Sequence, residues 1–483
     1  MPYLAPLSVL AFIVACGTST DSAATDTTHG VATTPPPVTA DGHDWTRFNV
    51  DEARTGIFDA QTGVTAAVLS TMKRQQVTLD GTVDASPIYL HNVIVNGAAH
   101  DVFFVTTSYG KTIAVDANDG AVLWRFTPAN YSQWAGSSRI TNATPVADPD
   151  RSAIYAASPD GHIQKLSVAD GHSIWSTAIT TLPTREKIAS ALNFSHGHVI
   201  AVTGGYIGDA PPYQGHVALL DAASGQLLRV WNSLCSDRAG LLDPSSCGES
   251  DSAIWGRAGA VVDSAGNIFV ATGNALWDGR TNWGDAVIEL DPGATRMLAN
   301  YTPSNTETLN ATDADVGSTS PVLVDATHVV QGGKDGKLRV LDLQAIGGTT
   351  AHRGGEVQTV STPSGSAIFS APAVWHRTDG VWIFAADGGA TAAWTYRAGT
   401  LTKAWSNGNG GTSPIVAGGV LFVYDPAGVL RAYDPTTGQS LGQLTCGSGH
   451  WNSPIVADGR IALPQGSANS HQTTGVLNIW RLP

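Results

Sequence analysis

Two apolar runs joined by a turn of the form Asp-x-x-x-Gly make up the stretch Thr112-Ile113-Ala114-Val115-Asp116-Ala117-Asn118-Asp119-Gly120-Ala121-Val122-Leu123-Trp124. Two more apolar runs precede it, Ala85-Ser86-Pro87-Ile88 and Val102-Phe103-Phe104-Val105. Short apolar segments separated by Gly, Asn, Asp and Pro are typical of β-strands joined by tight turns. This part of the chain therefore predicts one antiparallel sheet of four strands.

The same unit recurs down the chain with a period of about 50 residues. Its small-residue–Pro opening returns at Pro145, Pro321, Pro372, Pro414 and Pro454, with degenerate versions at Ser190-Ala191 and Ala258-Gly259. Its closing Trp returns at Trp175, Trp231 and Trp405. Eight units of four short strands predict an all-β, eight-bladed β-propeller with four antiparallel strands per blade.

The two ends of the chain are expected to share one blade. The last unit supplies three strands, near residues 453–456, 460–463 and 476–481, whereas Lys73 to Leu79 forms a spare strand before the first unit. A ring buries both faces of every blade, so we expect the spare strand to lie beside the strand near Ile479. A stacked β-sandwich array is the alternative, and it would leave edge strands open.

Composition excludes several classes of protein. The chain has 483 residues, of which 42% are hydrophobic and 14% charged, enough apolar surface for a large core. Its net charge of −14 disfavours a nucleic-acid partner, because an acidic surface repels phosphates. The 14 His show no paired spacing that indicates zinc, and no P-loop or Gly-x-Ser-x-Gly motif is present.

The first residues resemble an export signal. Leu4 to Ala15 is a short apolar run, and Val14-Ala15-Cys16-Gly17 resembles the lipobox of bacterial lipoproteins, although no Lys or Arg precedes the run. We expect a signal peptide over residues 1–15, a lipid-anchored flexible linker over 16–44 and the propeller over 45–483. The protein would then be an exported lipoprotein of the cell envelope; an ordinary signal peptide is the alternative.

Export permits disulfides in the remaining part of the chain. Cys235 and Cys247 lie in one polar loop, so we expect them to pair and Cys446 to stay free and buried beside Trp451. No Cys-x-x-Cys-His motif for attachment of a c-type haem is present.

The units at residues 114–124 and 432–438 resemble the repeat of pyrroloquinoline quinone (PQQ) propellers, and residues 45–56 resemble the start of that family. The resemblance covers about residues 45 to 483. It places the chain in the quinoprotein alcohol dehydrogenase-like superfamily. That superfamily includes quinoprotein alcohol dehydrogenases and a non-catalytic lipoprotein of the outer-membrane β-barrel assembly machinery. The repeat shapes blades rather than chemistry, so function depends on the connections between strands.

Long polar insertions interrupt the third to the fifth units. In quinoprotein alcohol dehydrogenases, a loop acid and a Gly-Asn turn bind a calcium ion that sits on the quinone, and a catalytic Asp and a basic residue follow. The resemblance places metal ligands at Asp209, Asn274 and Asp313, the catalytic base at Asp313 or Asp315, and a cofactor-binding cation at Lys334. Calcium prefers carboxylate and amide oxygens, which fits these residue types. Ordinary turns and caps are the alternative role of all five residues.

Three further residues are candidates for cofactor binding. Arg257 precedes an inner strand and is expected to point to the axis or to stack on Trp255. Trp451 is a platform for a planar ligand or a core residue, and Trp277 lies in the fourth insertion.

Together these expectations describe a membrane-tethered oxidoreductase with PQQ and calcium. It would act on an alcohol or sugar hydroxyl and pass electrons to a separate acceptor. A non-catalytic scaffold that binds a protein partner on one rim is the alternative, and other chemistry on the same rim, such as polysaccharide cleavage, is a third.

Overall fold

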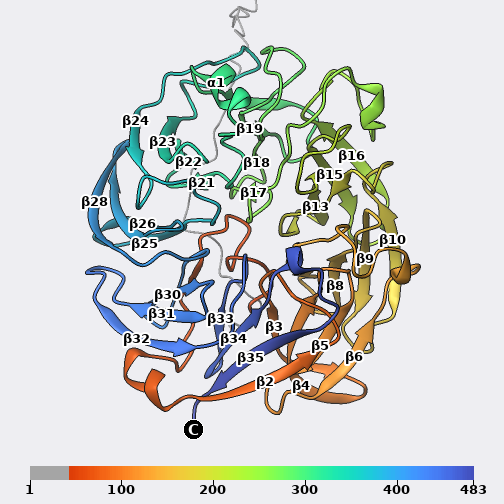
Figure 1. The fold of residues 1–483 in the computed structure, drawn as a ribbon, viewed down its shortest axis with the longest axis vertical. Coiled ribbons are helices and arrows are strands. Elements are labelled where there is room, and N and C mark those ends of the chain that lie inside the picture. Colours follow the sequence, from red (N-terminus) through yellow and green to blue (C-terminus); the bar gives the residue numbers. More distant parts are fainter. Residues whose placement is uncertain (1–42) are drawn as a thin grey trace, which may run out of the picture.

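The computed structural model describes residues 43–483 (Figure 1). The expected signal peptide, Cys16 and linker residues 16–42 lie outside the described residues. Within the described part, eight sheets form a ring, as the sequence predicts (Figure 1). No helix of this part is long and apolar enough to cross a membrane.

The first four blades follow one another around the ring. Blade 1 contains β3 (Ile88–Val95), β4 (Ala98–Thr106), β5 (Thr112–Asp116) and β6 (Val122–Phe126). Blade 2 contains β7 (Val146–Ala147), β8 (Ala153–Ala157), β9 (His162–Ser167) and β10 (Ser173–Ala178). Blade 3 contains β12 (Asn193–Ser195), β13 (His198–Val202), β15 (His216–Asp221) and β16 (Leu227–Asn232). Blade 4 contains β17 (Val261–Val262), β18 (Ile268–Ala271), β19 (Val287–Leu290) and β20 (Met297–Tyr301).

The other four blades complete the circle. Blade 5 contains β21 (Val322–Leu323), β22 (His328–Gly332), β23 (Lys337–Asp342) and β24 (Gln358–Ser361). Blade 6 contains β25 (Ala373–Arg377), β26 (Gly380–Ala386), β27 (Thr391–Arg397) and β28 (Thr400–Asn407). Blade 7 contains β29 (Ile415–Ala417), β30 (Val420–Asp425), β31 (Val429–Tyr433) and β32 (Ser440–Thr445). Blade 8 contains β33 (Ile455–Ala457), β34 (Arg460–Gln465), β35 (Gly475–Arg481) and β2 (Lys73–Leu79).

Few elements lie outside the blades. Strand β1 (Ile57–Phe58) adds to blade 7 in parallel with β29, and β11 (Glu186–Lys187) pairs with β14 (Gly204–Gly205) in a short ribbon. The helices among the described residues are short: α1 (Thr306–Ala311) and the 3₁₀ turns η1 (Ala66–Thr71), η2 (Tyr131–Gln133), η3 (Pro244–Ser246) and η4 (Ala468–Ser470).

The ring closes as the sequence predicts. Strand β2 pairs antiparallel with β35 over its whole length, with Gln75 opposite Ile479. Val77 and Leu79 of β2 are buried in the core that blade 8 shares with its neighbours. The first and last parts of the chain therefore hold each other in one blade.

Strand direction alternates within each blade, so the connections alternate between two rims. One rim, here called the site rim, carries the connections from second to third strands and those that lead from one blade to the next. The other, here called the far rim, carries the remaining turns. Asp209, Asn274 and Lys334 lie in connections from second to third strands, and residues 313–315 connect blade 4 to blade 5. All the candidate metal and catalytic residues therefore lie on the site rim.

The cysteines pair as expected. Cys235 and Cys247 form a disulfide with their Cα atoms 6.1 Å apart, which closes the polar loop that follows β16. Cys446 is free, but it is half-buried rather than fully buried.

Truncation of the closing strand should be costly. Leu79 is 1% exposed, so we expect Leu79→Ala to lower the free energy of unfolding by about 2–5 kcal/mol, because it leaves a cavity in the core of blade 8. The neighbouring Thr78 is exposed, and Thr78→Ala should change the same quantity by less than about 0.5 kcal/mol. Urea denaturation followed by Trp fluorescence measures both. Equal values for the two variants would show that β2 is not part of the cooperative unit.

Candidate functional site

A lysine and two acids form the centre of the candidate site. The Lys334 Nζ atom lies 2.5 Å from Asp313 Oδ1 and 2.8 Å from Asp315 Oδ2. The Lys334 backbone N–H also donates to the Asp315 carbonyl oxygen at 2.9 Å, which fixes the two connections side by side. The Asp315 side chain is 1% exposed and that of Asp313 is 62% exposed. One acid is thus buried behind the lysine and the other faces solvent.

Burial and charge shift the protonation of this cluster. Burial of Asp315 raises its pKa to about 6, although the Lys334 ammonium opposes the shift. Burial of Lys334 alone would lower its pKa, but the nearby carboxylates of Asp315 and Asp313 outweigh burial and raise it. Lys334 is therefore charged at neutral pH and holds the two acids together.

A further acid lies behind the cluster. Asp285 is fully buried, and burial together with repulsion by Asp315 raises its pKa to about 8. The Val316 N–H points at Asp285 Oδ1 from 3.4 Å. Asp285 is protonated at neutral pH, so the fold holds a neutral carboxylic acid beside an ionised one. Asp285 was not among the residues selected from the sequence, because nothing local in the sequence shows that it is buried.

Asp209 and Asn274 approach the same place from blades 3 and 4. The negative charge of Asp209 contributes to the raised pKa of Asp315, and Tyr213 donates its hydroxyl to Asp209 at 3.0 Å. An ideal Cβ on Gly317 would lie 2.5 Å from the Gly273 backbone nitrogen, so the chain next to Asn274 packs directly against the chain after Asp315. The structure thus brings the four predicted metal and catalytic residues and Lys334 into one region of the site rim.

Half-buried aromatic rings lead from this cluster toward the axis. Lys334 Nζ lies 5.1 Å from the centroid of the Trp255 ring. The ring centroids of Trp255 and Phe369 are 5.9 Å apart, and those of Phe369 and Trp451 are 5.4 Å apart. Arg257 lies 5.6 Å from the Trp451 centroid. The three rings, here called the aromatic row, end at a cation on each side.

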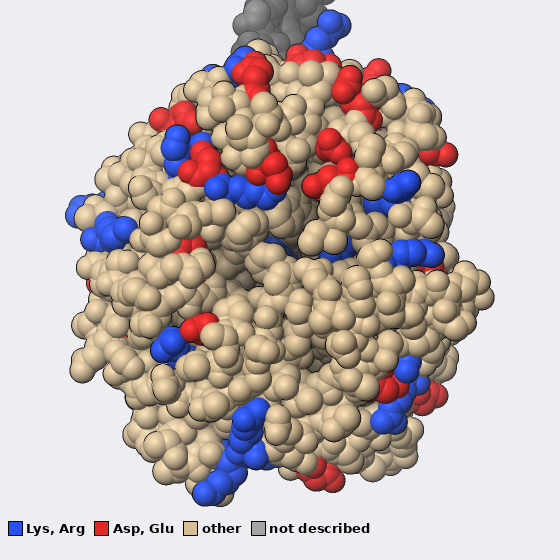
Figure 2. Space-filling view, in the orientation of Figure 1, with Lys and Arg blue, Asp and Glu red and all other residues tan. Residues whose placement is uncertain are grey.

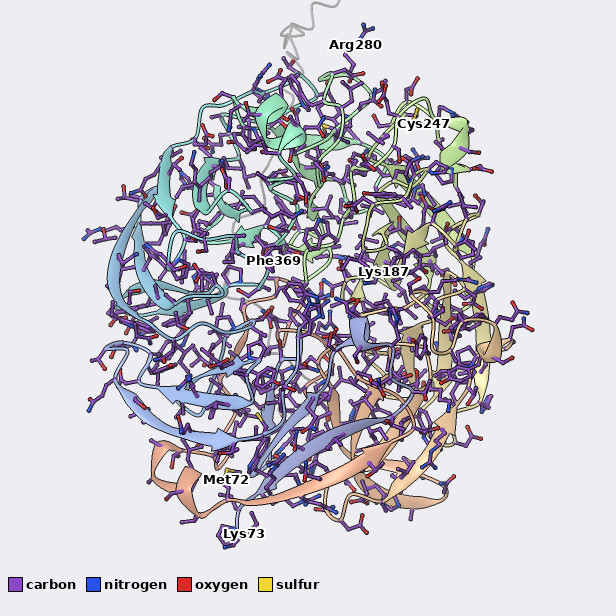
Figure 3. The ribbon with its side chains drawn as sticks, viewed as in Figure 1. Met72, Lys73, Lys187, Cys247, Arg280 and Phe369 are labelled. Atoms are coloured by element: carbon purple, nitrogen blue, oxygen red, sulfur yellow. A yellow bond between two sulfur atoms is a disulfide. The ribbon has the colours of Figure 1, made fainter. Side chains whose placement is uncertain are left out.

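The centre of the ring is hollowed near Phe369. Figure 3 places Phe369 and Lys187 near the centre of the ring, and Figure 2 shows that this face is hollowed there, with basic atoms visible in the hollow. Trp255 and Phe369 were not among the residues that sequence reasoning selected. Trp255 stands two residues before Arg257, and this closeness to a selected residue was the one feature of the sequence that could have pointed to it.

Arg257 has a structural role as well. Its guanidinium donates hydrogen bonds of 3.1–3.3 Å to the backbone carbonyls of Asp84, Asn142 and Ala189. These three residues lie just before the inner strands of blades 1 to 3. Arg257 stacks on Trp451. The alternative expected from the sequence was stacking on Trp255, but Lys334 lies over that ring instead. Arg257 therefore points to the axis, as expected, and links the starts of several blades.

The axis also holds a buried acid and a second lysine. Asp84 accepts from the backbone N–H of Trp451 at 2.7 Å and lies 2.8 Å from His450 Nδ1. Burial alone would raise the pKa of Asp84, but its hydrogen bond with His450 and nearby positive charge lower it. Burial lowers the pKa of Lys187 to about 8 despite the charge of Asp84. Trp451 is thus held in place by a charged network.

Trp277 lies apart from the aromatic row. Arg353 lies 5.7 Å from its ring centroid, and the ring packs against the core between blades 3 and 4. These contacts are those of a packing residue. The other predicted cofactor-binding residues differ, since Trp451 belongs to the aromatic row and Lys334 and Arg257 lie at its two ends.

The pKa of Asp285 predicts a pH-dependent stability. An unfolded Asp loses its proton near pH 4, whereas folded Asp285 keeps its proton up to about pH 8. Ionisation of Asp285 therefore lowers the stability of the native protein as the pH rises through this window. The Asp285→Asn variant lacks this contribution, so its free energy of unfolding relative to wild type should rise by at most about 1.4 kcal/mol per pH unit.

Urea denaturation in calcium-free buffer across this window measures the effect. The exposed Asp379, which pairs with Arg377 at 2.9 Å, supplies the control variant Asp379→Asn, for which we expect a nearly constant difference. A constant difference for Asp285→Asn would contradict a buried, protonated Asp285.

Comparison with known proteins agrees with this geometry. A family model described as outer membrane protein assembly factor BamB matches residues 56–233. A polyvinylalcohol dehydrogenase of Pseudomonas sp is 25% identical over 218 residues, 42% of this chain and 33% of that protein. Quinohemoprotein alcohol dehydrogenase ADH IIB of Pseudomonas putida is 28% identical over 152 residues, 31% of this chain and 20% of that protein. The matched regions thus span a third or less of these curated relatives.

Solved structures show the same fold over nearly the whole chain. The quinohemoprotein alcohol dehydrogenase from Comamonas testosteroni has a TM-score of 0.66 at 17% identity and covers 91% of this chain and 80% of its own. BamB from Moraxella catarrhalis has a TM-score of 0.51 at 15% identity and covers 85% of this chain and 98% of its own. The repeated unit, the closed ring and these similarities agree on the fold: the chain is a β-propeller similar to quinoprotein alcohol dehydrogenases and BamB, and residues 56–233 match the family model.

Proposed function

We propose that this chain is a quinoprotein-type oxidoreductase that binds PQQ and a calcium ion on the site rim and oxidises an alcohol or sugar hydroxyl. The observation that carries the proposal is the cluster of Lys334, Asp313 and Asp315 next to the aromatic row. The similarity to alcohol dehydrogenases supports the reaction class. The expected signal peptide and lipid anchor remain part of the proposal, since exported chains can meet such substrates outside the cytoplasm.

The acids of the site fit a hard cation. Asp315 Oδ1 is buried and makes no hydrogen bond, although Oδ2 contacts Lys334. A buried carboxylate oxygen without a donor is costly unless a cation approaches it. Asp209, Asn274 and Asp313 supply further oxygen atoms of the type that calcium prefers. These residues would hold the metal, and Asp285 would stay protonated behind them.

The aromatic row fits a planar anionic cofactor. Trp255, Phe369 and Trp451 offer half-buried ring surface, and Lys334 and Arg257 place positive charge at its two ends. Flat anionic molecules bind well to such a surface, because stacking and charge attraction act together. PQQ, when bound, supplies a quinone that accepts the hydride.

Asp313 is the residue best placed to remove the hydroxyl proton. Its carboxylate is largely exposed, so a substrate can reach it, and it lies 2.5 Å from the Lys334 ammonium. A general base must reach the substrate hydroxyl in its ionised state. Asp315 is buried on the other side of Lys334, so it positions the lysine and the metal.

A non-catalytic scaffold is the second candidate function. The family model that matches residues 56–233 is described as an assembly factor, and BamB of Moraxella catarrhalis shares the propeller fold. In that case the hollow of the site rim would receive a protein partner, and the charged cluster would serve packing alone.

The two functions are separated by a titration of the purified chain with PQQ and calcium. For an oxidoreductase we expect a rise in melting temperature with both ligands together and alcohol-dependent reduction of a dye. Asp313→Asn should lower dye reduction by about 100-fold or more and leave the melting temperature without ligands nearly unchanged, because the side chain is 62% exposed.

Asp379→Asn is the matched control and should keep both properties. If neither PQQ nor calcium changes the melting temperature of the wild type, the oxidoreductase proposal is wrong and the scaffold proposal takes its place. If Asp313→Asn retains full dye reduction, Asp313 is not the base.

A further inference from the structure

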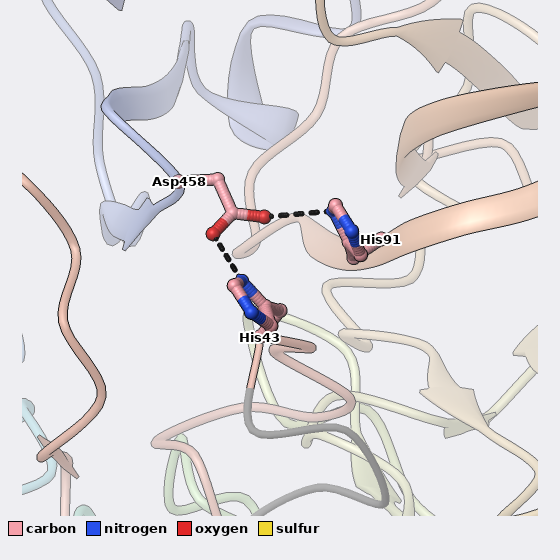
Figure 4. Close-up of side chains that lie close together, drawn as sticks. All are labelled: His43, His91 and Asp458. Carbon is pink, nitrogen blue, oxygen red and sulfur yellow. Dashed lines mark hydrogen bonds and ion pairs between the residues drawn. The ribbon is translucent and has the colours of Figure 1, made fainter.

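His43, His91 and Asp458 form a second group of metal-ligating side chains, shown in Figure 4. The turn that carries Asp458 belongs to the far rim, whereas the proposed active site lies on the site rim. His43 is the first described residue and precedes blade 1, His91 belongs to β3, and Asp458 forms the turn between β33 and β34. The group therefore joins the segment that leads into the ring to blades 1 and 8, where the ring closes.

The ligand atoms of these residues face one another. Asp458 Oδ1 lies 2.6 Å from His43 Nδ1, and Asp458 Oδ2 lies 3.0 Å from His91 Nδ1. All three residues offer ligand atoms within 4.8 Å of one another. The two imidazole rings stack with centroids 4.7 Å apart, which holds both Nδ1 atoms toward the same carboxylate.

His91 Nδ1 has a position that hydrogen bonding does not explain. It lies 3.0 Å from Asp458 Oδ2 and 3.0 Å from Asp101 Oδ1, yet it is buried and makes no aligned hydrogen bond to either. A ring nitrogen that faces the Asp458 oxygen without an aligned hydrogen bond can direct its lone pair at a cation bound between the two side chains. This atom is the independent sign of a ligand at the site.

The carboxylates are held in place by outer partners. Tyr89 donates its hydroxyl to Asp458 Oδ2 at 2.8 Å. Arg460 contacts Asp101 Oδ2 at 2.9 Å, which leaves Asp101 Oδ1 turned toward His91. Hydrogen bonds of this kind orient the ligands in metal sites of proteins.

We propose that His43, His91 and Asp458 bind one zinc ion. Two imidazoles and one carboxylate, with a water molecule in the fourth position, are ligands that zinc accepts in tetrahedral geometry, and bonds of about 2.0–2.1 Å place such ligands about 3.3–3.5 Å apart. The separations of 2.6 and 3.0 Å between Asp458 and the two imidazoles need to open by only a few tenths of an ångström to nearly an ångström. The Asp458 carboxylate offsets part of the charge of the ion.

The zinc ion would fasten the ring closure. Trp45, two residues after His43, already exchanges backbone hydrogen bonds with Tyr89 of blade 1 at 2.9 and 2.8 Å. A metal bound by His43, blade 1 and blade 8 ties together three segments that are remote in the unfolded chain. Binding to the folded state alone stabilises it by mass action. The sequence shows no zinc motif because His43 and Asp458 are 415 positions apart.

The test is a zinc titration by calorimetry on the full chain without a histidine tag. Excess calcium in the buffer keeps the oxygen-rich site rim occupied. We expect one zinc ion per chain and a higher melting temperature with zinc. His91→Gln and Asp458→Asn should each weaken binding by more than about 100-fold, because even loss of an outer partner costs about 10- to 100-fold.

A matched control comes from His172, an exposed histidine 2.6 Å from Asp170, and His172→Gln should bind zinc as the wild type does. The visible absorption spectrum of the wild type with Co²⁺ is independent of whether the variants fold, and a tetrahedral spectrum supports the proposal. Zinc affinity that is unchanged in His91→Gln, or a spectrum of cobalt with water ligands alone, would overturn it and leave an ion-pair network.

Discussion

The contact between a tryptophan of one blade and the turn of the next holds the ring together. An ideal Cβ on Gly171 would lie 2.5 Å from the Trp124 ring, so only glycine allows the ring to lie flat on this turn. The Trp124 indole N–H donates to the Val168 carbonyl of the same turn at 2.9 Å. The pair Trp175 and Gly225 repeats the contact between blades 2 and 3. The Trp and the turn that ends in Gly are thus one joint across a blade boundary, between blades 1 and 2 and again between blades 2 and 3.

Because these joints and the buried strands fix the blades, the connections on the site rim are free to carry chemistry. Insertions of blades 3 to 5 bring Asp209, Asn274 and Asp315 to one place without disturbing any strand. Crowded acids repel one another, and the structure offsets this with the Lys334 ammonium and with a proton on Asp285. A cation at Asp315 Oδ1, which makes no hydrogen bond, would reduce the same repulsion. The charges of the site therefore agree with the proposal that it binds a metal ion.

Both rims depend on ring closure. On the site rim, Arg257 gathers carbonyls from the starts of three blades and stacks on Trp451 of a fourth, so the aromatic row exists only in the closed ring. On the far rim, His91 and Asp458 meet because β2 joins β35 and brings blade 8 beside blade 1. His43 and Asp44, which the sequence analysis assigned to the linker, contact this junction. The Asp44 carboxylate accepts from the His91 backbone N–H at 2.7 Å.

The sequence by itself determined the blade number, the closing strand and the disulfide, because each depends on a local pattern: a repeated unit, a spare strand and two cysteines in one loop. The resemblance to quinoprotein alcohol dehydrogenases also assigned Lys334, Asp313 and Asp315 to one site. Only the tertiary structure decided that Asp285 is buried and neutral, that Trp255 and Phe369 form a row with Trp451, and that Trp277 lies apart. It alone joined His43 to Asp458. Burial and contact between remote segments arise from closure of the ring, and no local pattern encodes them.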